Sequence, residues 1–163
     1  MKNLIILAIF SVIILPKTNA ASLVGRLGVG MTDHLVTGQK ALSVKLQRSR
    51  SSALGGHFSL DSSDDGIFYG LGLKAYRYIY EEPQLNFYSA ISGTYLTFKD
   101  ESTDDSLSGY QIDGTLGAEF SFQGLESIGF SFEFGVGLSN YQDETQFKTL
   151  GHSMVASAVH FYL

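Results

Sequence analysis

Residues 128–138 read Ile-Gly-Phe-Ser-Phe-Glu-Phe-Gly-Val-Gly-Leu, and this stretch decides the fold. Its even positions hold six apolar residues, whereas its odd positions hold glycine, serine and one glutamate. Successive side chains of a β-strand point to opposite faces, so a period of two separates these sets. The stretch therefore predicts a strand with one bulky apolar face and one small, polar face.

The same alternation recurs along the chain and predicts eight strands in all. The other seven are expected at 23–31, 40–48, 53–60, 67–80, 85–98, 110–122 and 151–163. No face can be assigned between Tyr76 and Tyr80, where a bulge would fit, nor in 85–98. The connections alternate between long polar segments and short turns, which indicates an up-and-down meander: 32–39, 61–66, 99–109 and 139–150 are long, and 49–52, 81–84 and 123–127 are short.

Side-chain volume indicates which face is outside. An eight-stranded barrel has an interior that side chains just fill, so the phenylalanine rings must face outward and the glycines inward. An apolar outer wall needs lipid around it. The prediction is an all-β, eight-stranded, antiparallel transmembrane barrel. Aromatic residues that would form its two interfacial girdles are Tyr69, Tyr95 and Tyr110 at one end and Tyr78, Tyr80, Phe87 and Phe161 at the other.

The first twenty residues have the features of a secretory signal peptide. Lys2 is followed by an apolar run from Leu4 to Leu15, and Thr18-Asn19-Ala20 offers small residues at a cleavage site. The barrel is then expected over 21–163. The chain has no cysteine and a net charge of −5, which excludes disulfides and disfavours nucleic-acid binding. No cofactor is expected, because the glycine motifs lie within strands.

At this point the chain resembles the small eight-stranded outer-membrane proteins of the OmpA transmembrane domain, OmpX and opacity-protein type. His160-Phe161-Tyr162-Leu163 ends the chain inside a strand and looks like the C-terminal signal read by the outer-membrane assembly machinery, although that signal usually ends in Phe. The resemblance implies residence in the outer membrane of a Gram-negative bacterium, as a monomer among outer-membrane lipids and lipopolysaccharide. It implies a role in envelope integrity or surface interaction without catalysis.

The assigned faces send several ionisable side chains into the lumen. Charges in so narrow a space must be paired, because removing one partner of a buried pair costs about 3–5 kcal/mol. We expect a network that closes the lumen, with a narrow polar path as the alternative. Its members would be Arg26, Lys45, Lys74, Asp113, Glu119 and Glu133, beside His57, His152 and His160.

Two other functions remain open from the sequence. A lipid A-modifying enzyme, of deacylase or acyltransferase type, would need a serine next to a histidine, and His57 and Ser59 are the best candidates because positions i and i+2 share a face. A secreted soluble barrel that binds an apolar ligand is the second alternative. It would have to turn its rings inward.

Acidic residues gather in the long connections, which hold ten of the 16 Asp and Glu residues. The densest clusters are candidate divalent-cation ligands or bridges to lipopolysaccharide phosphates: Asp61, Asp64 and Asp65, and Asp100, Asp104 and Asp105. Neither cluster has the spacing of a dedicated calcium loop. Solvation of the loops is the simpler interpretation, and no metal is expected.

Overall fold

The computed structural model describes residues 23–63, 66–100, 106–141, 144–150 and 155–163, and these contain β-strands and no helix. The expected signal peptide lies outside the described residues. The strands are β1 (Leu27–Thr32), β2 (Ala41–Ser49), β3 (Ser52–Ser63), β4 (Gly66–Glu82), β5 (Leu85–Asp100), β6 (Ser106–Phe122), β7 (Leu125–Tyr141), β8 (Glu144–Thr149) and β9 (Ala156–Tyr162).

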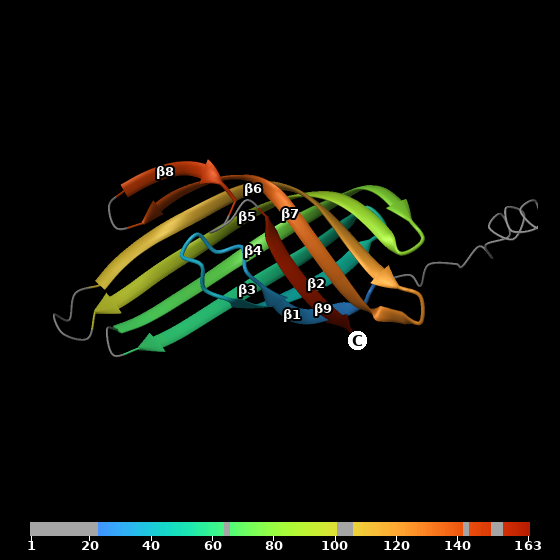
Figure 1. The fold of residues 1–163 in the computed structure, drawn as a ribbon, viewed down its shortest axis with the longest axis horizontal. Helices are drawn as coiled ribbons and strands as arrows, with labels where there is room; N and C mark the ends of the chain where they lie inside the picture. Colours follow the sequence, from blue (N-terminus) through green and yellow to red (C-terminus); the bar gives the residue numbers. More distant parts are fainter. Residues whose placement is uncertain (1–22, 64–65, 101–105, 142–143, 151–154) are drawn as a thin grey trace, which may run out of the picture.

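The strands close into a barrel. From β1 to β7, each strand pairs antiparallel with the next one in sequence. The ring closes because β9 pairs with both β7 and β1. Strands β8 and β9 lie one after the other along β7 and together form the eighth strand of the wall (Figure 1). The prediction of an all-β, eight-stranded antiparallel barrel is confirmed.

The eighth wall strand differs from its prediction. The polar loop expected over 139–150 is wrong, because β7 continues to Tyr141 and β8 pairs with its outer part, with Ser139 opposite Gln146. The strand expected over 151–163 begins at Ala156, and 151–154 lie outside the described residues. Residues 144–149 are polar in both phases except for Phe147, so no alternation marked them as a strand.

The strands are staggered around the ring. A row of paired residues that starts at Val29 and passes through β2 to β6 reaches β7 at Leu138. In the other direction, through β9, Val29 leads to Ile128, which is ten residues away along β7. A stagger of this kind accompanies a strand tilt of about 35–45°. The wall strands therefore cross the barrel obliquely, as Figure 1 shows.

The barrel has two different ends. Turns at 50–51, 83–84 and 123–124 lie at the end where the chain finishes, which we call the turn end (Figure 1). Gly124 has a φ of 83°, a conformation that glycine adopts without strain and that this tight turn uses. The opposite end, which we call the loop end, carries segment 33–40 and the strand ends at Ser63, Asp100 and Tyr141.

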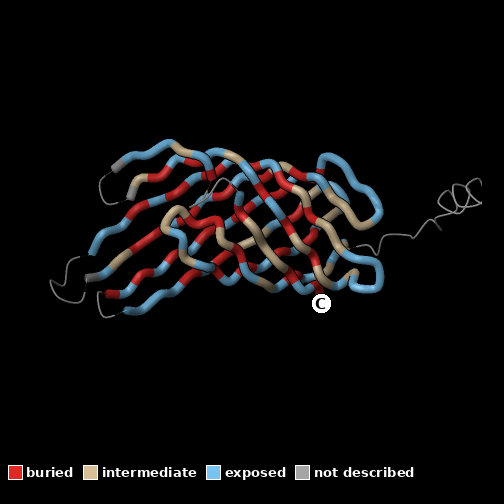
Figure 2. Tube along the Cα trace, viewed as in Figure 1, coloured by how far each residue is buried: buried red, intermediate tan, exposed pale blue. Residues whose placement is uncertain are grey.

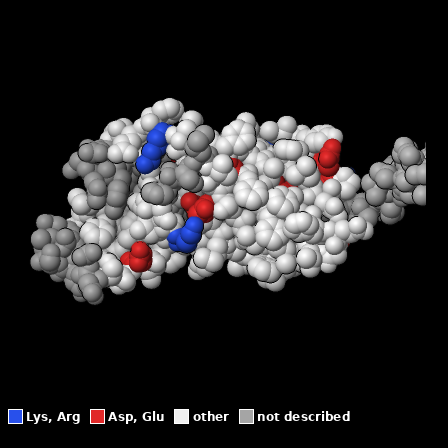
Figure 3. All heavy atoms as spheres, in the orientation of Figure 1, with Lys and Arg blue, Asp and Glu red and all other residues white. Residues whose placement is uncertain are grey.

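The two faces of the wall have opposite chemistry. Burial alternates along β4, where every second residue from Gly66 to Tyr78 is buried and the residues between are exposed (Figure 2). Large apolar side chains cover the outside, among them Leu73, Phe132 and Phe134, whereas polar and charged side chains are buried inside. On the side drawn in Figure 3, few charged atoms interrupt the wall. The predicted arrangement of faces is confirmed.

One aromatic residue faces the opposite way to its prediction. Tyr78, which we expected in the outer girdle, is buried in the lumen, whereas Tyr80 is exposed. The pairing of β4 with β5 shifts register between these two residues, which is the bulge that the sequence allowed. The alternation that holds before the bulge places Tyr78 inside. The bulge adds one residue, so Ile79 and Tyr80 both lie outside.

Candidate functional site

The lumen contains an ion pair between β2 and β6. Lys45 Nζ lies 2.7 Å from Glu119 Oε2, and the two side chains are 1% and 2% exposed. The hydroxyl of Tyr162 on β9 donates a hydrogen bond to the other carboxylate oxygen, Oε1 of Glu119. Both oxygens of the carboxylate are therefore bonded, which compensates for its removal from water.

A second ion pair joins β4 to β7. Lys74 Nζ lies 2.5 Å from Glu133 Oε2, and both side chains are buried. The hydroxyl of Tyr88 on β5 donates to Oε1 of Glu133 at 2.8 Å. Each luminal glutamate is thus held by one lysine and one tyrosine, and the two pairs cross the interior between strands that are not neighbours in the wall.

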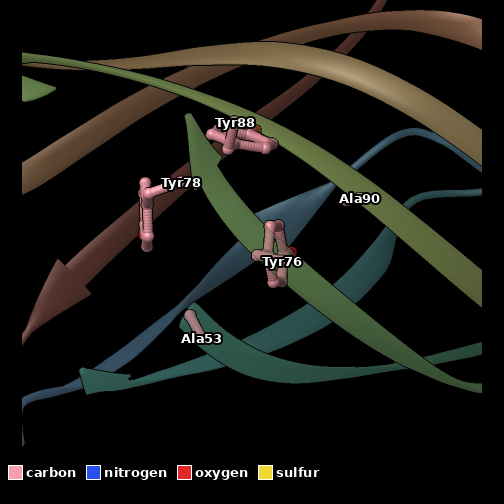
Figure 4. Close-up of a cluster of buried hydrophobic side chains, with 5 residues drawn as sticks. All are labelled: Ala53, Tyr76, Tyr78, Tyr88 and Ala90. Atoms are coloured by element: carbon pink, nitrogen blue, oxygen red, sulfur yellow. The ribbon is translucent and has the colours of Figure 1, made fainter. Parts of the chain in front are cut away.

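Three tyrosine rings surround the ammonium group of Lys45. Its Nζ lies 4.6 Å from the ring centroid of Tyr76, 5.0 Å from that of Tyr88 and 5.5 Å from that of Tyr78. Tyr76 and Tyr88 also meet edge to face, with centroids 5.3 Å apart (Figure 4). The negative faces of aromatic rings attract a cation, so the cage adds to the ion pair. The sequence left Tyr76 without a face and placed Tyr78 in an outer girdle, so it did not reveal this cage.

Arg26 does not join the network as predicted. Its guanidinium donates to the backbone carbonyls of Tyr162 and Leu163 and to the hydroxyl of Ser127. None of the ion pairs between described residues includes it. Arg26 precedes β1 at the turn end, and it connects the end of β9 to the β6–β7 hairpin.

Asp113 lies deeper toward the loop end of the lumen. It accepts hydrogen bonds from Ser92 Oγ at 3.1 Å and from Gln111 Nε2 at 2.8 Å. The ring of His34 approaches it, with Nε2 3.8 Å from Oδ2 of Asp113. Asp113 therefore belongs to a hydrogen-bonded group nearer the loop end than the lysine–glutamate pairs. It forms an ion pair with neither Lys45 nor Lys74.

Segment 33–40, which connects β1 to β2, folds into the mouth of the barrel (blue loop in Figure 1). Leu35 is completely buried, and it packs in a cluster with Ala41, Phe68 and Leu96. The side chain of Gln111 fixes the backbone of the segment: it donates to the carbonyl of His34 at 3.1 Å and accepts from the amide of Val36 at 2.8 Å. The segment therefore plugs the loop end.

The base of this plug is also fixed. Asp33 accepts hydrogen bonds from the amide and the hydroxyl of Ser157 on β9, at 2.5 and 2.9 Å. Lys40 Nζ lies 3.6 Å from Asp33 Oδ2 across the segment. The sequence predicted only a long polar connection over 32–39 here. Leu35 and Val36 were the signal for burial, because they are adjacent apolar residues within an otherwise polar connection.

The imidazole of His34 is buried without hydrogen bonds. Both of its ring nitrogens lack a hydrogen-bond partner among the described residues, and the ring is 1% exposed. It meets the ring of His57 edge to face, with centroids 4.4 Å apart. Burial, with the positive charge of Lys74 and the proximity of His57, holds the pKa of His34 well below its usual value. Segment 33–40 is therefore docked in the barrel with the imidazole of His34 uncharged.

A small polar cavity lies beneath His34. It offers about 10 Å³ to the centre of a water molecule, which is room for one water. Its lining includes His34, His57, His160, Lys74 and Glu133. Such a space admits no organic substrate.

The catalytic candidates do not form a reactive pair. His57 Nε2 is bonded to Thr94 Oγ1 at 2.8 Å, and Ser59 Oγ donates to the carbonyl of Lys40 at 2.8 Å. A serine and a histidine do meet elsewhere: Ser43 Oγ lies 2.9 Å from His160 Nε2. The other nitrogen of His160 has no partner among the described residues, so no carboxylate orients that ring.

The described acidic residues form no metal site. No group of three or more His, Cys, Asp or Glu within the described part of the chain could hold a metal ion. Asp61 is exposed near the end of β3, and Asp100 ends β5. The remaining candidates, Asp64, Asp65, Asp104 and Asp105, lie outside the described residues, as does His152.

Comparison with known proteins gives no relative. No protein-family model matches the chain, and no curated protein or solved structure does. Within the described ranges, no helix is long and apolar enough to cross a membrane. The function must therefore be inferred from the geometry of the barrel.

Proposed function

We propose that this chain is a non-enzymatic, integral outer-membrane β-barrel with a plugged polar lumen. It serves envelope integrity or surface interaction through its acidic loop end. The observation that carries the proposal is the inverted distribution of side chains. Two lysine–glutamate pairs are buried inside, and large apolar side chains cover the outside. In water this arrangement would expose the apolar wall to solvent, whereas in a bilayer the same wall would contact lipid acyl chains.

The height of the apolar wall supports the same proposal. On β4, exposed apolar and aromatic side chains run from Ile67 and Tyr69 to Ile79 and Tyr80, interrupted by Arg77 near the turn end. With a rise of about 3.3 Å per residue and a tilt of roughly 40°, the ten residue steps from Tyr69 to Ile79 span about 25 Å. The apolar band of outer-membrane barrels has about this height. In this placement the turn end faces the periplasm.

The interior argues against the two alternative functions. A carrier of apolar ligands would need an apolar cavity, but the lumen is filled by ion pairs, tyrosine rings and segment 33–40. A hydrolase would need an oriented serine–histidine pair, and none of the described luminal contacts supplies one. The plugged lumen also agrees with a role that does not involve diffusion of solutes.

Expression of the full chain in a Gram-negative host tests the proposal. The protein should sediment with the outer membrane, resist extraction by alkaline carbonate, and migrate faster on a gel when it is not boiled. Its removal should raise envelope permeability without changing the mass of lipid A. Recovery of a folded, monodisperse protein from the soluble periplasm would overturn the membrane placement, and a change in lipid A mass abolished by His57→Ala would favour the enzyme.

A further inference from the structure

We propose that the β2–β3 turn binds the phosphate of an anionic phospholipid in the leaflet at the turn end, through Arg48, Arg50 and Arg77. This inference rests on the proposed membrane location and adds a specific lipid site to it. All three arginines are exposed. They are three of the four arginines in the chain, and the fourth, Arg26, is held by backbone carbonyls.

Strand pairing brings the three arginines to one place on the rim. Arg48 follows Leu42, Val44 and Leu46 on the outward face of β2. Arg50 lies in the turn, and Arg77 points outward from β4. In the pairing register, Ser49 is opposite Ser52, and Ser52 is opposite Arg77. The arginines therefore flank one short turn on adjacent strands.

Hydroxyl groups hold this turn in shape. Ser49 Oγ lies 2.8 Å from Ser52 Oγ and 3.3 Å from Ser51 Oγ, and it accepts a hydrogen bond from the amide of Ser51. The carbonyl of Ser51 accepts a hydrogen bond from the amide of Tyr78, which fastens the turn to β4. The backbone that carries Arg48 and Arg50 is thus fixed before a ligand arrives, which reduces the entropy lost on binding.

The charge of these arginines is not neutralised within the described protein. None of the ion pairs between described residues includes Arg48, Arg50 or Arg77. The other two turns at this end are acidic, with Glu81 and Glu82 beside one and Glu126 beside the other. Guanidinium groups bind phosphate oxygens in a bidentate manner, so a phosphate is the group that this basic turn fits.

The surroundings favour a lipid over a free anion. Leu46, Leu54 and Ala75 form a row across β2, β3 and β4 on the outward face, next to the arginines. Leu46 and Leu54 are exposed large apolar side chains, which acyl chains would cover. Arg77 lies between Ala75 and Ile79 on the outside of β4, so its long stem can follow the apolar wall while its head reaches the phosphate layer.

Native mass spectrometry of the full chain tests the site. The protein is purified in detergent from host membranes and reconstituted into nanodiscs of phosphatidylcholine with a tenth phosphatidylglycerol. It is then released, and the ratio of retained phosphatidylglycerol to phosphatidylcholine is measured. A basic residue near an anionic membrane surface is worth about a fivefold preference. The wild type should retain phosphatidylglycerol well above its share, and Arg48→Gln with Arg77→Gln should lower the ratio at least tenfold.

Two variants control for charge and folding. Lys99→Gln removes an exposed positive charge at the loop end and should leave the ratio unchanged. Arg77→Lys keeps the charge but loses bidentate geometry, and it should retain part of the preference. Heat-dependent gel migration of each variant verifies that the barrel is intact. Equal ratios in the wild type and the double variant, or an equal loss in Lys99→Gln, would overturn the site.

The source of the phosphate is tested in the same preparation. Inorganic phosphate at millimolar concentration should leave the bound phosphatidylglycerol in place, because it brings no acyl chains. Displacement by inorganic phosphate would mean an anion site and would overturn the lipid assignment. If the wild type inserts into nanodiscs but has no lipid preference, the lipid site fails and the membrane location stands. If it does not insert, both fail.

Discussion

Lys45 and Glu119 are 74 positions apart in the chain, yet their Nζ and Oε2 atoms lie 2.7 Å apart inside the barrel. The pair is buried on all sides, and Tyr162 and the tyrosine cage complete its contacts. Its two partners come from opposite parts of the wall, β2 and β6. The contact therefore depends on the whole ring and is a direct probe of its integrity.

Removal of one partner should destabilise the barrel strongly. Glu119→Gln leaves the Lys45 ammonium buried without its counter-ion and should lower the free energy of unfolding by about 3–5 kcal/mol. Urea titration in lipid vesicles, followed by circular dichroism, measures the change. Glu81→Gln, on the exposed rim, is the matched control and should have little effect. The double variant Lys45→Met with Glu119→Leu should lose less than Glu119→Gln alone, and an equal loss would contradict the pairing.

A charge placed on the outer wall should be costly if lipid surrounds it. Phe132 is exposed on β7, so Phe132→Arg should reduce stability by about 2–4 kcal/mol near the bilayer midplane. Phe147→Arg, on β8 at the loop end, should cost about 0–1 kcal/mol because it lies near or beyond the interface. The same vesicle titration compares them. Equal tolerance of the two arginines would contradict the proposed membrane band.

Two glycines on adjacent strands should respond differently to a methyl group. A Cβ at Gly135 would lie 2.1 Å from the carbonyl oxygen of Gly114 and 2.8 Å from Thr115 Cα, which is rigid backbone. Gly135→Ala should therefore cost about 1–3 kcal/mol or reduce the yield of folded barrel. A Cβ at Gly114 meets nothing within 4 Å, so Gly114→Ala is the matched control. Gel migration without boiling gives the folded fraction, and full folding of Gly135→Ala would refute the close approach.

Acid should loosen the plug formed by segment 33–40. The pKa of His34 is lowered in the docked segment, so the undocked form binds a proton more readily. The imidazole faces His57 on β3, Lys74 on β4 and Asp113 on β6. Burial and Lys74 outweigh the attraction of the aspartate. Docking is at full strength above about pH 6.5 and weakens below it by up to about 1.4 kcal/mol per pH unit.

Hydrogen exchange of the Val36 amide measures this effect, because that amide is bonded to Gln111 only when the segment is docked. After correction for the intrinsic exchange rate, protection should fall between pH 6.5 and 5. In His34→Gln the protection should no longer depend on pH in this range. Constant protection in the wild type would show that the plug does not respond to the charge of His34.

The alternation of side chains made the barrel predictable from the sequence. Phe130, Phe132 and Phe134 on one face, with glycine and glutamate on the other, determine which side of β7 faces inward. The same alternation places four charged side chains in the lumen: Lys45, Lys74, Glu119 and Glu133. Period-two patterns are local, so they could be read without knowledge of the partners of each strand.

The remaining features depend on contacts that no local pattern encodes. Tyr76, Tyr78 and Tyr80 share one phase, opposite to that of Leu71 and Leu73, yet Tyr80 lies outside. Only the register with β5 shows that Tyr76 and Tyr78 lie around Lys45. The inward fold of segment 33–40 depends on a cup formed by Phe68 and Leu96, which come from β4 and β5. Strand β8 has a single apolar residue, Phe147, so only its pairing with β7 identifies it as a strand.

The sequence distance across the luminal ion pairs has a consequence for how the barrel assembles. Hairpins of neighbouring strands can form while the ring is still open, but the contacts Lys45–Glu119 and Lys74–Glu133 span 74 and 59 positions. Contacts between distant positions are slow to establish because the intervening chain must first be ordered. We therefore expect these pairs to form late, once the strands that lie between their partners have assembled, and to stabilise the closed barrel against reopening.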